Sequence, residues 1–144
     1  MEESLIAKVR ATFVLPDTDI RTYSPLTLAY IGDSIYDLII RTMLVEKGNA
    51  QVNRLHQRAS KLVKAVAQKD IVHAIMDLLS EEELGVFKRG RNAKSVTTAK
   101  NASVTDYRTA TGFEALIGYL YLTEQLDRIL YLVKEGLNRT EGLV

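Results

Sequence analysis

The sequence predicts an all-α fold, and three observations support that prediction. Apolar residues recur at spacings of three and four rather than two, which is the periodicity of helices that bury one face. Only two prolines, Pro16 and Pro25, interrupt the chain, so few positions are barred from a helix interior. The 144 residues are 47% hydrophobic, which suffices for one compact core but not for two. We therefore expect a single helical-bundle domain over residues 1–144.

Capping residues predict where the helices begin and end. A short helix around Leu5–Val14 lies within an N-terminal extension, residues 1–23. Ser24-Pro25 is typical of a cap followed by the first helical position, so the next helix runs to about Lys47 and stops at Gly48-Asn49. Ser80 and Glu83 form a capping box before another helix. The remaining helices are expected at about Val52–Lys69, Ile71–Leu79, Glu81–Gly90, Tyr107–Leu122 and Glu124–Asn138.

The helix after Ser24 carries an acid, Asp33, that no neighbour compensates. Apolar residues leave this helix almost no polar face, so we expect Asp33 to be buried, and no basic residue lies three or four positions away. A buried carboxylate must be paired, protonated or bound to metal. Gly32 indicates close approach of another backbone or a ligand beside it. Asp37, in contrast, has Arg41 one turn on and is expected to form an ordinary ion pair.

A second acid, Glu114, repeats this pattern on a later apolar helix. Glycines flank it at positions 112 and 118, and its neighbours three and four residues on, Ile117 and Gly118, cannot pair with it. Mg²⁺ and Mn²⁺ prefer oxygen ligands and often use only one or two protein carboxylates. From the residues alone, a metal site and a protonated or water-satisfied pair remain two open interpretations.

The segment 91–106 lacks apolar periodicity and is predicted to be a long, basic, RNA-contacting loop. Between Lys88 and Arg108 six basic residues face one acid, Asp106, while the rest of the chain is acidic. No aromatic residue interleaves these charges before Tyr107, which favours backbone and shape recognition of duplex RNA over stacking on single strands. The residues expected to contact RNA are Arg89, Arg91, Asn92, Lys94, Ser95, Lys100, Asn101 and Arg108.

Composition excludes several other classes of function. Without cysteine the chain has no disulfide, thiolate metal site or cysteine nucleophile, which fits a reducing compartment. The start is acidic and no apolar run approaches the length of a membrane span, so we expect a soluble, cytoplasmic protein without a membrane partner. His56 and His73 have no neighbour that completes an acid–base pair, and we assign them no catalytic role.

These motifs resemble a known family. The block Leu28–Asp37, in which Gly32-Asp33 precedes an apolar run, resembles the signature helix of ribonuclease III domains, and Phe113–Gly118 resembles their second acidic helix. Nearly the whole chain after about Ser24 is similar to Mini-ribonuclease III, the short bacterial branch without a double-stranded-RNA-binding domain. The other motifs that carry this resemblance are Arg89–Ser95, Lys100-Asn101 and Tyr107-Arg108.

The resemblance implies a homodimeric endoribonuclease that cleaves both strands of double-stranded RNA by metal-assisted phosphodiester hydrolysis. It implies Mg²⁺, with Mn²⁺ as a substitute, held by Asp33 and Glu114 as catalytic ligands. The implied substrate is the precursor of 23S, large-subunit ribosomal RNA, whose 5′ and 3′ ends it matures, with a ribosomal protein as a candidate partner.

Some positions depart from full-length ribonuclease III. Leu26, Ala29 and Thr111 stand where that family has carboxylates, so we expect weaker metal binding. The missing carboxylates leave open a non-catalytic RNA-binding or ribosome-associated protein that keeps the ribonuclease III fold. A helical interaction module with purely structural acids is a second alternative.

Overall fold

The computed structural model describes residues 4–93 and 103–140, and in these ranges the regular structure is entirely helical. This confirms the predicted all-α fold. Two short 3₁₀ turns, Ile20–Thr22 and Met76–Leu78, accompany the α-helices. The α-helices are α1 (Leu5–Thr12), α2 (Pro25–Glu46), α3 (Val52–Val63), α4 (Ala65–Ala74), α5 (Glu81–Asn92), α6 (Val104–Leu122) and α7 (Leu126–Thr140). No helix of the described ranges is long and apolar enough to cross a membrane.

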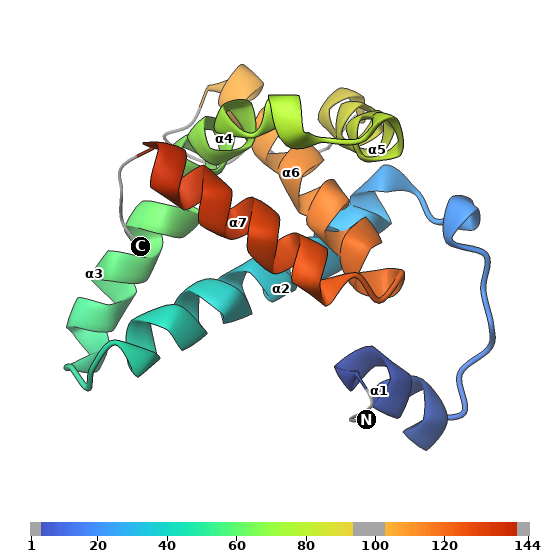
Figure 1. Ribbon diagram of the computed structural model, residues 1–144, viewed down its shortest axis with the longest axis horizontal. Coiled ribbons are helices and arrows are strands. Elements are labelled where there is room, and N and C mark those ends of the chain that lie inside the picture. Colours follow the sequence, from blue (N-terminus) through green and yellow to red (C-terminus); the bar gives the residue numbers. More distant parts are fainter. Residues whose placement is uncertain (1–3, 94–102, 141–144) are drawn as a thin grey trace.

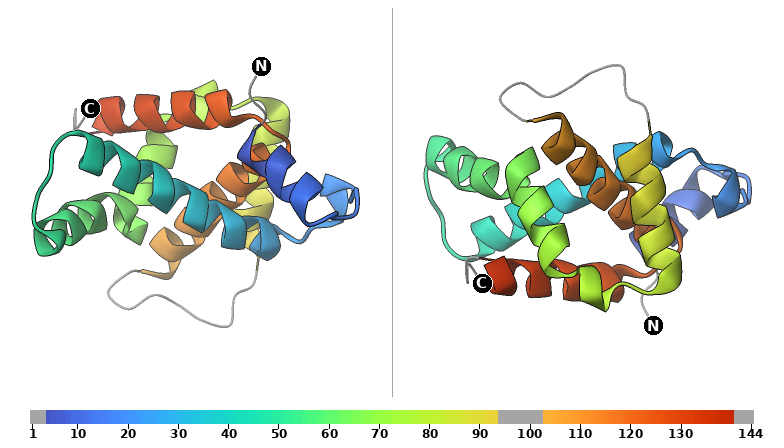
Figure 2. Two further views of the ribbon diagram at one scale, coloured as in Figure 1. Left: turned by 90° about the horizontal axis from the view of Figure 1, so that it is seen from below. Right: turned by 90° about the horizontal axis from the view of Figure 1, so that it is seen from above.

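Helix α6 lies at the centre of the bundle. Figures 1 and 2 show it between α2 on one side and α4 and α5 on the other, with α7 along a third side. Phe113, Leu116 and Leu120 of α6 are fully buried. The ring of Tyr36 from α2 meets Phe113 edge-on, with 5.3 Å between ring centroids, and the Tyr36 hydroxyl donates to the Leu62 carbonyl at 2.7 Å. The two helices that carry the predicted acids are therefore packed directly together.

Glycines bring the backbones of α2 and α6 into contact. A Cβ placed on Gly32 would overlap the Glu114 carbonyl oxygen and lie 2.7 Å from the Gly118 nitrogen. A Cβ on Gly118 would likewise overlap the Leu28 carbonyl oxygen. Both positions therefore need a residue without a side chain. The close backbone approach predicted at Gly32 is confirmed, and the approaching backbone is that of the helix with the second acid.

The expected helix Val52–Lys69 is wrong, because the chain breaks at Lys64. That residue is extended, with φ −65° and ψ 158°, and separates α3 from α4. The break lets α3 pack against α2 while α4 packs against α6 and α7. The side-chain amide of Gln68 donates to the Val63 carbonyl at 2.8 Å and thereby satisfies a group at the end of α3. Apolar spacing alone does not reveal such a break.

The basic loop is shorter than predicted at both ends. Helix α5 continues to Asn92, and α6 begins at Val104, where the Ser103 hydroxyl accepts from the Asp106 backbone N–H at 3.0 Å. The prediction of a loop over 91–106 is therefore wrong for those flanking residues. Its central part, 94–102, lies outside the described residues.

The helix expected at Ile71–Leu79 is also wrong, because α4 occupies Ala65–Ala74 and a 3₁₀ turn follows it at Met76–Leu78. Other predicted boundaries are confirmed or move by two or three residues. Ser24 caps α2 with Pro25 at its first position, and both hydrogen bonds of the Ser80–Glu83 capping box are present. Helix α7 begins at Leu126 rather than Glu124, because Glu124 takes a left-handed φ of 58° and interrupts the helix. Helix α1 ends at Thr12, since Val14 also has a positive φ, 50°.

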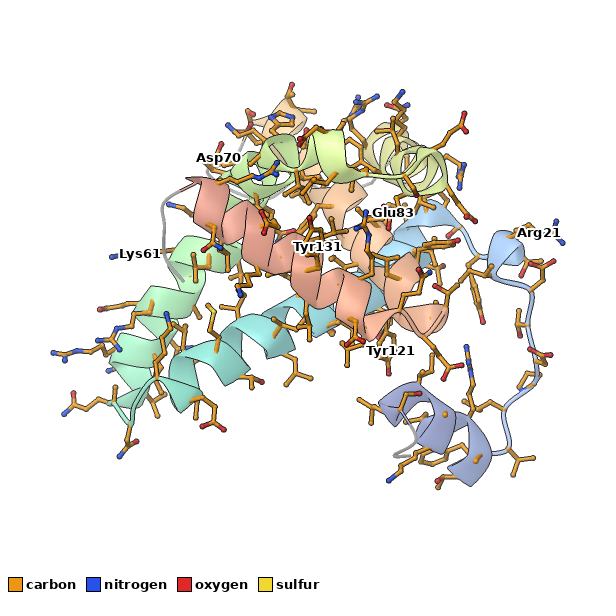
Figure 3. All side chains as sticks on the ribbon, in the orientation of Figure 1. Arg21, Lys61, Asp70, Glu83, Tyr121 and Tyr131 are labelled. Atoms are coloured by element: carbon orange, nitrogen blue, oxygen red, sulfur yellow. The ribbon has the colours of Figure 1, made fainter. Side chains whose placement is uncertain are left out.

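The N-terminal extension is joined to the bundle by few contacts. Figure 1 shows α1 apart from the other helices, and Figure 3 shows Arg21 directed outward from the connection to α2. The Ser4 hydroxyl donates to Glu124 at 2.8 Å, and Arg10 donates to the Leu122 carbonyl at 2.9 Å. Only Ile6 of α1 is buried. Helix α1 therefore lies against the α6–α7 connection, whereas Ile20 and Tyr23 of the extension pack against a small buried cluster near the start of α2.

Candidate active site

The contact between α2 and α6 brings Asp33 and Glu114 together. Asp33 directly follows Gly32, whose backbone lies against the Glu114 carbonyl, and the Asp33 carboxyl is close enough to raise the pKa of Glu114. A neighbouring carboxyl group makes the ionisation of an acid less favourable, because two like charges repel each other. The two acids predicted separately from the sequence therefore form one pair.

The pair is electrostatically uncompensated among the described residues. Burial is the main cause that raises the pKa of Glu114, from 4.5 to about 8, and the adjacent Asp33 carboxyl raises it further. The amide of Gln68 acts in the opposite direction by donating to Glu114. No salt bridge between described residues includes Asp33 or Glu114. Near neutral pH, Glu114 favours its protonated form unless a cation compensates the charge.

The expectation that Asp33 is buried is wrong. Asp33 is exposed, whereas Glu114 is half-buried. The face of α2 that meets α6 is the face of Gly32, and the next residue points about 100° further around the helix, where α6 no longer covers it. The pair is thus open to solvent on the Asp33 side and enclosed on the Glu114 side, so a ligand has access to it.

Gln68 of α4 is a residue of the site that the sequence did not reveal. Its Nε2 donates to Glu114 Oε2 at 3.2 Å and to the Val63 carbonyl at 2.8 Å. The side chain is 3% exposed, and its Oε1 has no hydrogen-bond partner. A neutral amide in an apolar stretch carries no charge signal. Only the break between α3 and α4 places it beside Glu114.

Two of the three positions that lack the further carboxylates, 29 and 111, have other contacts in this structure. Ala29 is buried in the core, and the Thr111 hydroxyl donates to the Tyr107 carbonyl at 3.0 Å. Within residues 4–93 and 103–140, no group of three or more His, Cys, Asp or Glu side chains is arranged to hold a metal ion. In these ranges Asp33 and Glu114 are therefore not part of a larger cluster of acidic or histidine side chains.

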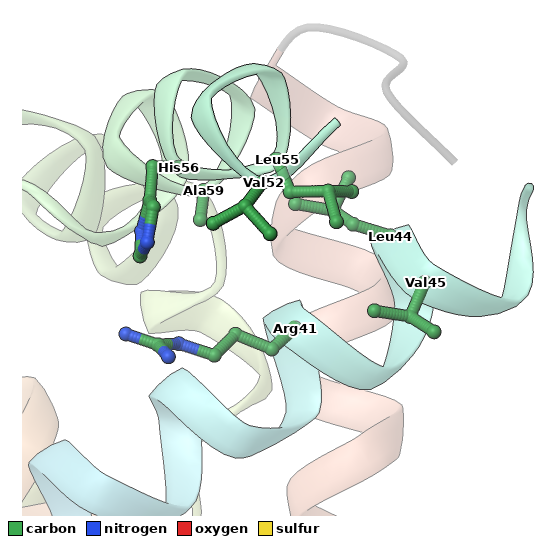
Figure 4. A pocket seen from close by; sticks show the side chains of 7 residues that line it. All are labelled: Arg41, Leu44, Val45, Val52, Leu55, His56 and Ala59. Atoms are coloured by element: carbon green, nitrogen blue, oxygen red, sulfur yellow. The ribbon is translucent and has the colours of Figure 1, made fainter. Parts of the chain in front are cut away.

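The second acid of α2 has the structural role predicted for it. Asp37 pairs with Arg41 at 2.9 Å. Arg41 also lines a hollow of about 170 Å³ between α2 and α3, where Figure 4 shows it near His56 and the apolar side chains of Leu44 and Val52. His56 and His73 are both exposed. The hollow does not include the paired acids.

Four of the predicted RNA-contacting residues lie in the described ranges. Arg108 is exposed near the start of α6, and Arg89 is exposed on α5. Arg91 lies over the Phe87 ring at 5.6 Å, and its Nε donates to Asn92 at 3.3 Å. Arg89 and Arg91 are two residues apart on a helix and therefore face opposite sides, so they do not form one surface. The other four, Lys94, Ser95, Lys100 and Asn101, lie outside the described residues.

Comparison with known proteins identifies the class to which this fold and site belong. The model of the ribonuclease III domain matches residues 26–125, a range that contains both helices of the carboxylate pair. The chain belongs to the ribonuclease III family. The class is that of the ribonuclease III endoribonucleases.

Several proteins similar to this chain are Mini-ribonucleases, the short branch of the family whose motifs this sequence resembles. A Mini-ribonuclease 3 of Thermoanaerobacter sp. is 50% identical over 90% of this chain and 91% of its own, and one of Clostridium tetani is 49% identical over 85% and 82%. A crystal structure of a protein from Fusobacterium nucleatum, 34% identical, superposes with a TM-score of 0.75 over 82% of this chain and 94% of its own. The resemblance to Mini-ribonuclease III is thereby confirmed.

Proposed function

We propose that this protein cleaves double-stranded RNA at the Asp33–Glu114 pair with the help of a divalent cation. The observation that carries the proposal is the close backbone contact of α2 and α6, which places Asp33 beside Glu114 without a salt bridge to either acid among the described residues. Beside Asp33, Glu114 disfavours its own ionised state, and a divalent cation bound at the pair would reverse that preference. Membership of the ribonuclease III family supports the choice of RNA as substrate.

The donor set fits Mg²⁺, and Mn²⁺ as a substitute. Asp33 and Glu114 supply carboxylate oxygens, which are the ligands that both ions prefer, and Mg²⁺ commonly keeps several waters beside one or two carboxylates. The exposure of Asp33 leaves room for such waters. Bound there, a divalent cation supplies Lewis-acid chemistry: it lowers the pKa of a water and stabilises charge on a phosphate.

The residues of the pair have different tasks in this proposal. Glu114 is fixed by the Gln68 amide and by the packing of α6, so it sets where the cation is held. Asp33 is open to solvent and faces the approaching RNA. Because the described histidines are exposed and unpaired with an acid, proton transfer is left to water and to the two carboxylates.

Cutting both strands of a duplex requires two sites, and we propose that a homodimer supplies them. Tyr30 of α2, three residues before Asp33, is 81% exposed, and Leu26 on the same helix is also exposed. Large apolar side chains exposed beside the site are suited to contact a second copy. We expect the basic residues between Lys88 and Arg108 to bind phosphates of the duplex from more than one face, since Arg89 and Arg91 point to opposite sides of α5.

The proposed cellular substrate is the precursor of 23S ribosomal RNA, with a ribosomal protein as candidate partner. The support is the resemblance of the acidic and basic motifs to Mini-ribonuclease III, together with the relatives that carry that name. We expect that cells depleted of the protein accumulate 23S precursors with unprocessed 5′ and 3′ ends. Sequencing of RNA ends measures this, and mature ends at normal abundance would contradict the assignment of this substrate.

The test of the activity is cleavage of a duplex RNA by purified wild type in Mg²⁺, Mn²⁺ or EDTA. We expect Asp33→Asn and Glu114→Gln each to reduce the rate by roughly 1,000-fold or more, since each removes a carboxylate from the cation. Asp37→Asn is the matched control, because it removes a carboxylate one turn away that pairs with Arg41. We expect it to cleave within a few-fold of wild type.

Two results would overturn the proposal. Robust cleavage by Asp33→Asn or Glu114→Gln would remove the pair from the active site. Absence of cleavage by folded wild type in both Mg²⁺ and Mn²⁺, with retained binding to duplex RNA, would favour the non-catalytic RNA-binding alternative.

A further inference from the structure

Gln68 has two donor contacts and one unused acceptor at a place where three helices meet. Its amide nitrogen reaches the end of α3 at Val63 and the Glu114 carboxyl of α6, while its own backbone belongs to α4. Its Oε1 is buried without a hydrogen-bond partner. Among the described residues, no other buried side-chain nitrogen or oxygen lacks a partner. A buried polar atom without a partner is costly and needs an explanation.

The orientation of this amide follows from its neighbours. The Val63 carbonyl can only accept a hydrogen bond, and Gln68 meets it at 2.8 Å. The nitrogen must therefore face Val63, and from the same position it donates to Glu114 Oε2 at 3.2 Å. A flipped amide would place its oxygen against the Val63 carbonyl, which cannot donate. The oxygen is consequently the free end, on the same planar group that touches Glu114.

We propose that Gln68 is the third residue of the cation site, with its amide nitrogen orienting Glu114 and its amide oxygen joining the oxygen donors. This inference rests on the proposed function, because it concerns the cation held by Asp33 and Glu114. Side-chain amide oxygens are regular ligands of hard divalent cations, and a cation or its water supplies the partner that Oε1 lacks. Gln68 thus adds a neutral donor to a pair that has few ligands.

A purely structural role explains only part of these observations. A cap on α3 needs one N–H of Gln68, which the Val63 carbonyl accepts. A capping role explains neither the hydrogen bond that Gln68 donates to the Glu114 carboxylate nor the oxygen that has no partner. A cation site explains the N–H on Glu114 and the unpartnered oxygen, while the cap on α3 explains the other N–H.

The test is a calorimetric titration of Mn²⁺ into the RNA-free protein, comparing wild type with three variants. Gln68→Leu removes both amide functions at similar volume and is expected to weaken Mn²⁺ binding by about 10-fold to 100-fold. Gln68→Glu replaces the amide oxygen by a carboxylate and is expected to bind Mn²⁺ at least 10-fold more tightly, since it adds a charged ligand. Gln125→Leu is the matched control, because it removes an exposed amide that donates to Thr123.

The outcomes separate this inference from the proposed function. If wild type binds no Mn²⁺, both the proposed cation site and the role of Gln68 are overturned. If wild type binds Mn²⁺ while Gln68→Leu and Gln68→Glu bind it equally well, the cation site stands and the role of Gln68 is overturned. Thermal melting in EDTA shows which variants fold. If Gln68→Leu does not fold, Gln68→Glu decides: tighter Mn²⁺ binding supports the inference, and unchanged or weaker binding overturns it.

Discussion

Two glutamates in adjacent helices show opposite solutions to burial of an acid. Glu83 of α5 is 6% exposed and receives two hydrogen bonds from Arg128, each 2.8 Å, as well as the Ser80 backbone N–H. The Arg128 guanidinium is the main cause that holds the pKa of Glu83 below its usual value. Glu114 of α6 instead faces Asp33, and its pKa is raised.

The difference teaches how a structural acid can be told from a functional one in this chain. Glu83 finds its compensating charge within the fold, at Arg128 of α7. Glu114 has a donor, Gln68, but meets another acid where a cation would be expected. An acid without a compensating charge lowers the stability of the fold. A binding or catalytic role explains why such an acid is present.

Gly32→Ala should have the largest effect, because it breaks the contact that creates the acidic pair. A Cβ at this position overlaps the Glu114 carbonyl, so α2 and α6 must separate. We expect a loss of about 3 kcal/mol or more of unfolding free energy, in the range of severe overpacking, and loss of cleavage. Urea denaturation and the cleavage assay measure both.

Gly85→Ala is the matched control for this substitution. Its Cβ meets only the flexible end of Arg89 at 3.4 Å, and it lies within α5. Alanine is the better helix former by about 1 kcal/mol, so we expect equal or higher stability and normal cleavage. A Gly32→Ala protein as stable and active as wild type would disprove the close contact between α2 and α6.

Glu83→Gln should affect stability but not chemistry. It leaves Arg128 partly buried beside a neutral amide, and we expect a loss of roughly 2 kcal/mol of unfolding free energy. The cleavage rate per folded molecule should stay within a few-fold of wild type. Glu81→Gln, at an exposed position in the same first turn of α5, is expected to cost less than about 1 kcal/mol. Loss of cleavage in a folded Glu83→Gln protein would contradict the division of roles between the two glutamates.

The two glutamates should give opposite pH dependence of stability in EDTA. The folded-state pKa of Glu114 is raised from 4.5 to about 8, so its contribution is full below pH 4.5 and is lost as pH rises toward 8. The folded-state pKa of Glu83 is lowered from 4.5, so its contribution is present above that pH and is lost as pH falls below it.

Denaturation curves across this pH range separate the two contributions. We expect Glu114→Gln to remove the fall in stability on the alkaline side and Glu83→Gln to reduce the fall on the acidic side. An alkaline fall of unchanged size in Glu114→Gln would show that another group causes it.

The sequence predicted what depends on neighbours along the chain. The caps at Ser24 and Ser80 and the Asp37–Arg41 pair are local hydrogen bonds or contacts between adjacent helical turns, and the structure confirms them. Gly32 was informative because a glycine inside an apolar helix has few explanations other than close approach. The acidic residues were identified by the lack of a partner one turn away, which is also a local property.

The features that the sequence did not predict depend on contacts between helices. Asp33 is exposed because α6 covers the Gly32 face of α2, and no pattern within α2 shows which face another helix covers. The break at Lys64 follows from the separate packing of α3 and α4. Gln68 enters the site only because of that break. A neutral side chain whose partners lie 5 and 46 positions away in the sequence has no local signal.

The central claim is that the Asp33–Glu114 pair binds a divalent cation. The most direct test is thermal melting of wild type and Glu114→Gln at pH 8, in EDTA and in Mn²⁺. In EDTA we expect Glu114→Gln to melt a few degrees higher, because it removes an acid that burial and Asp33 destabilise. In Mn²⁺ we expect the order to reverse, since only wild type gains stability from binding the ion. The same order of melting temperatures in both conditions, with no Mn²⁺ stabilisation of wild type, would contradict the cation site.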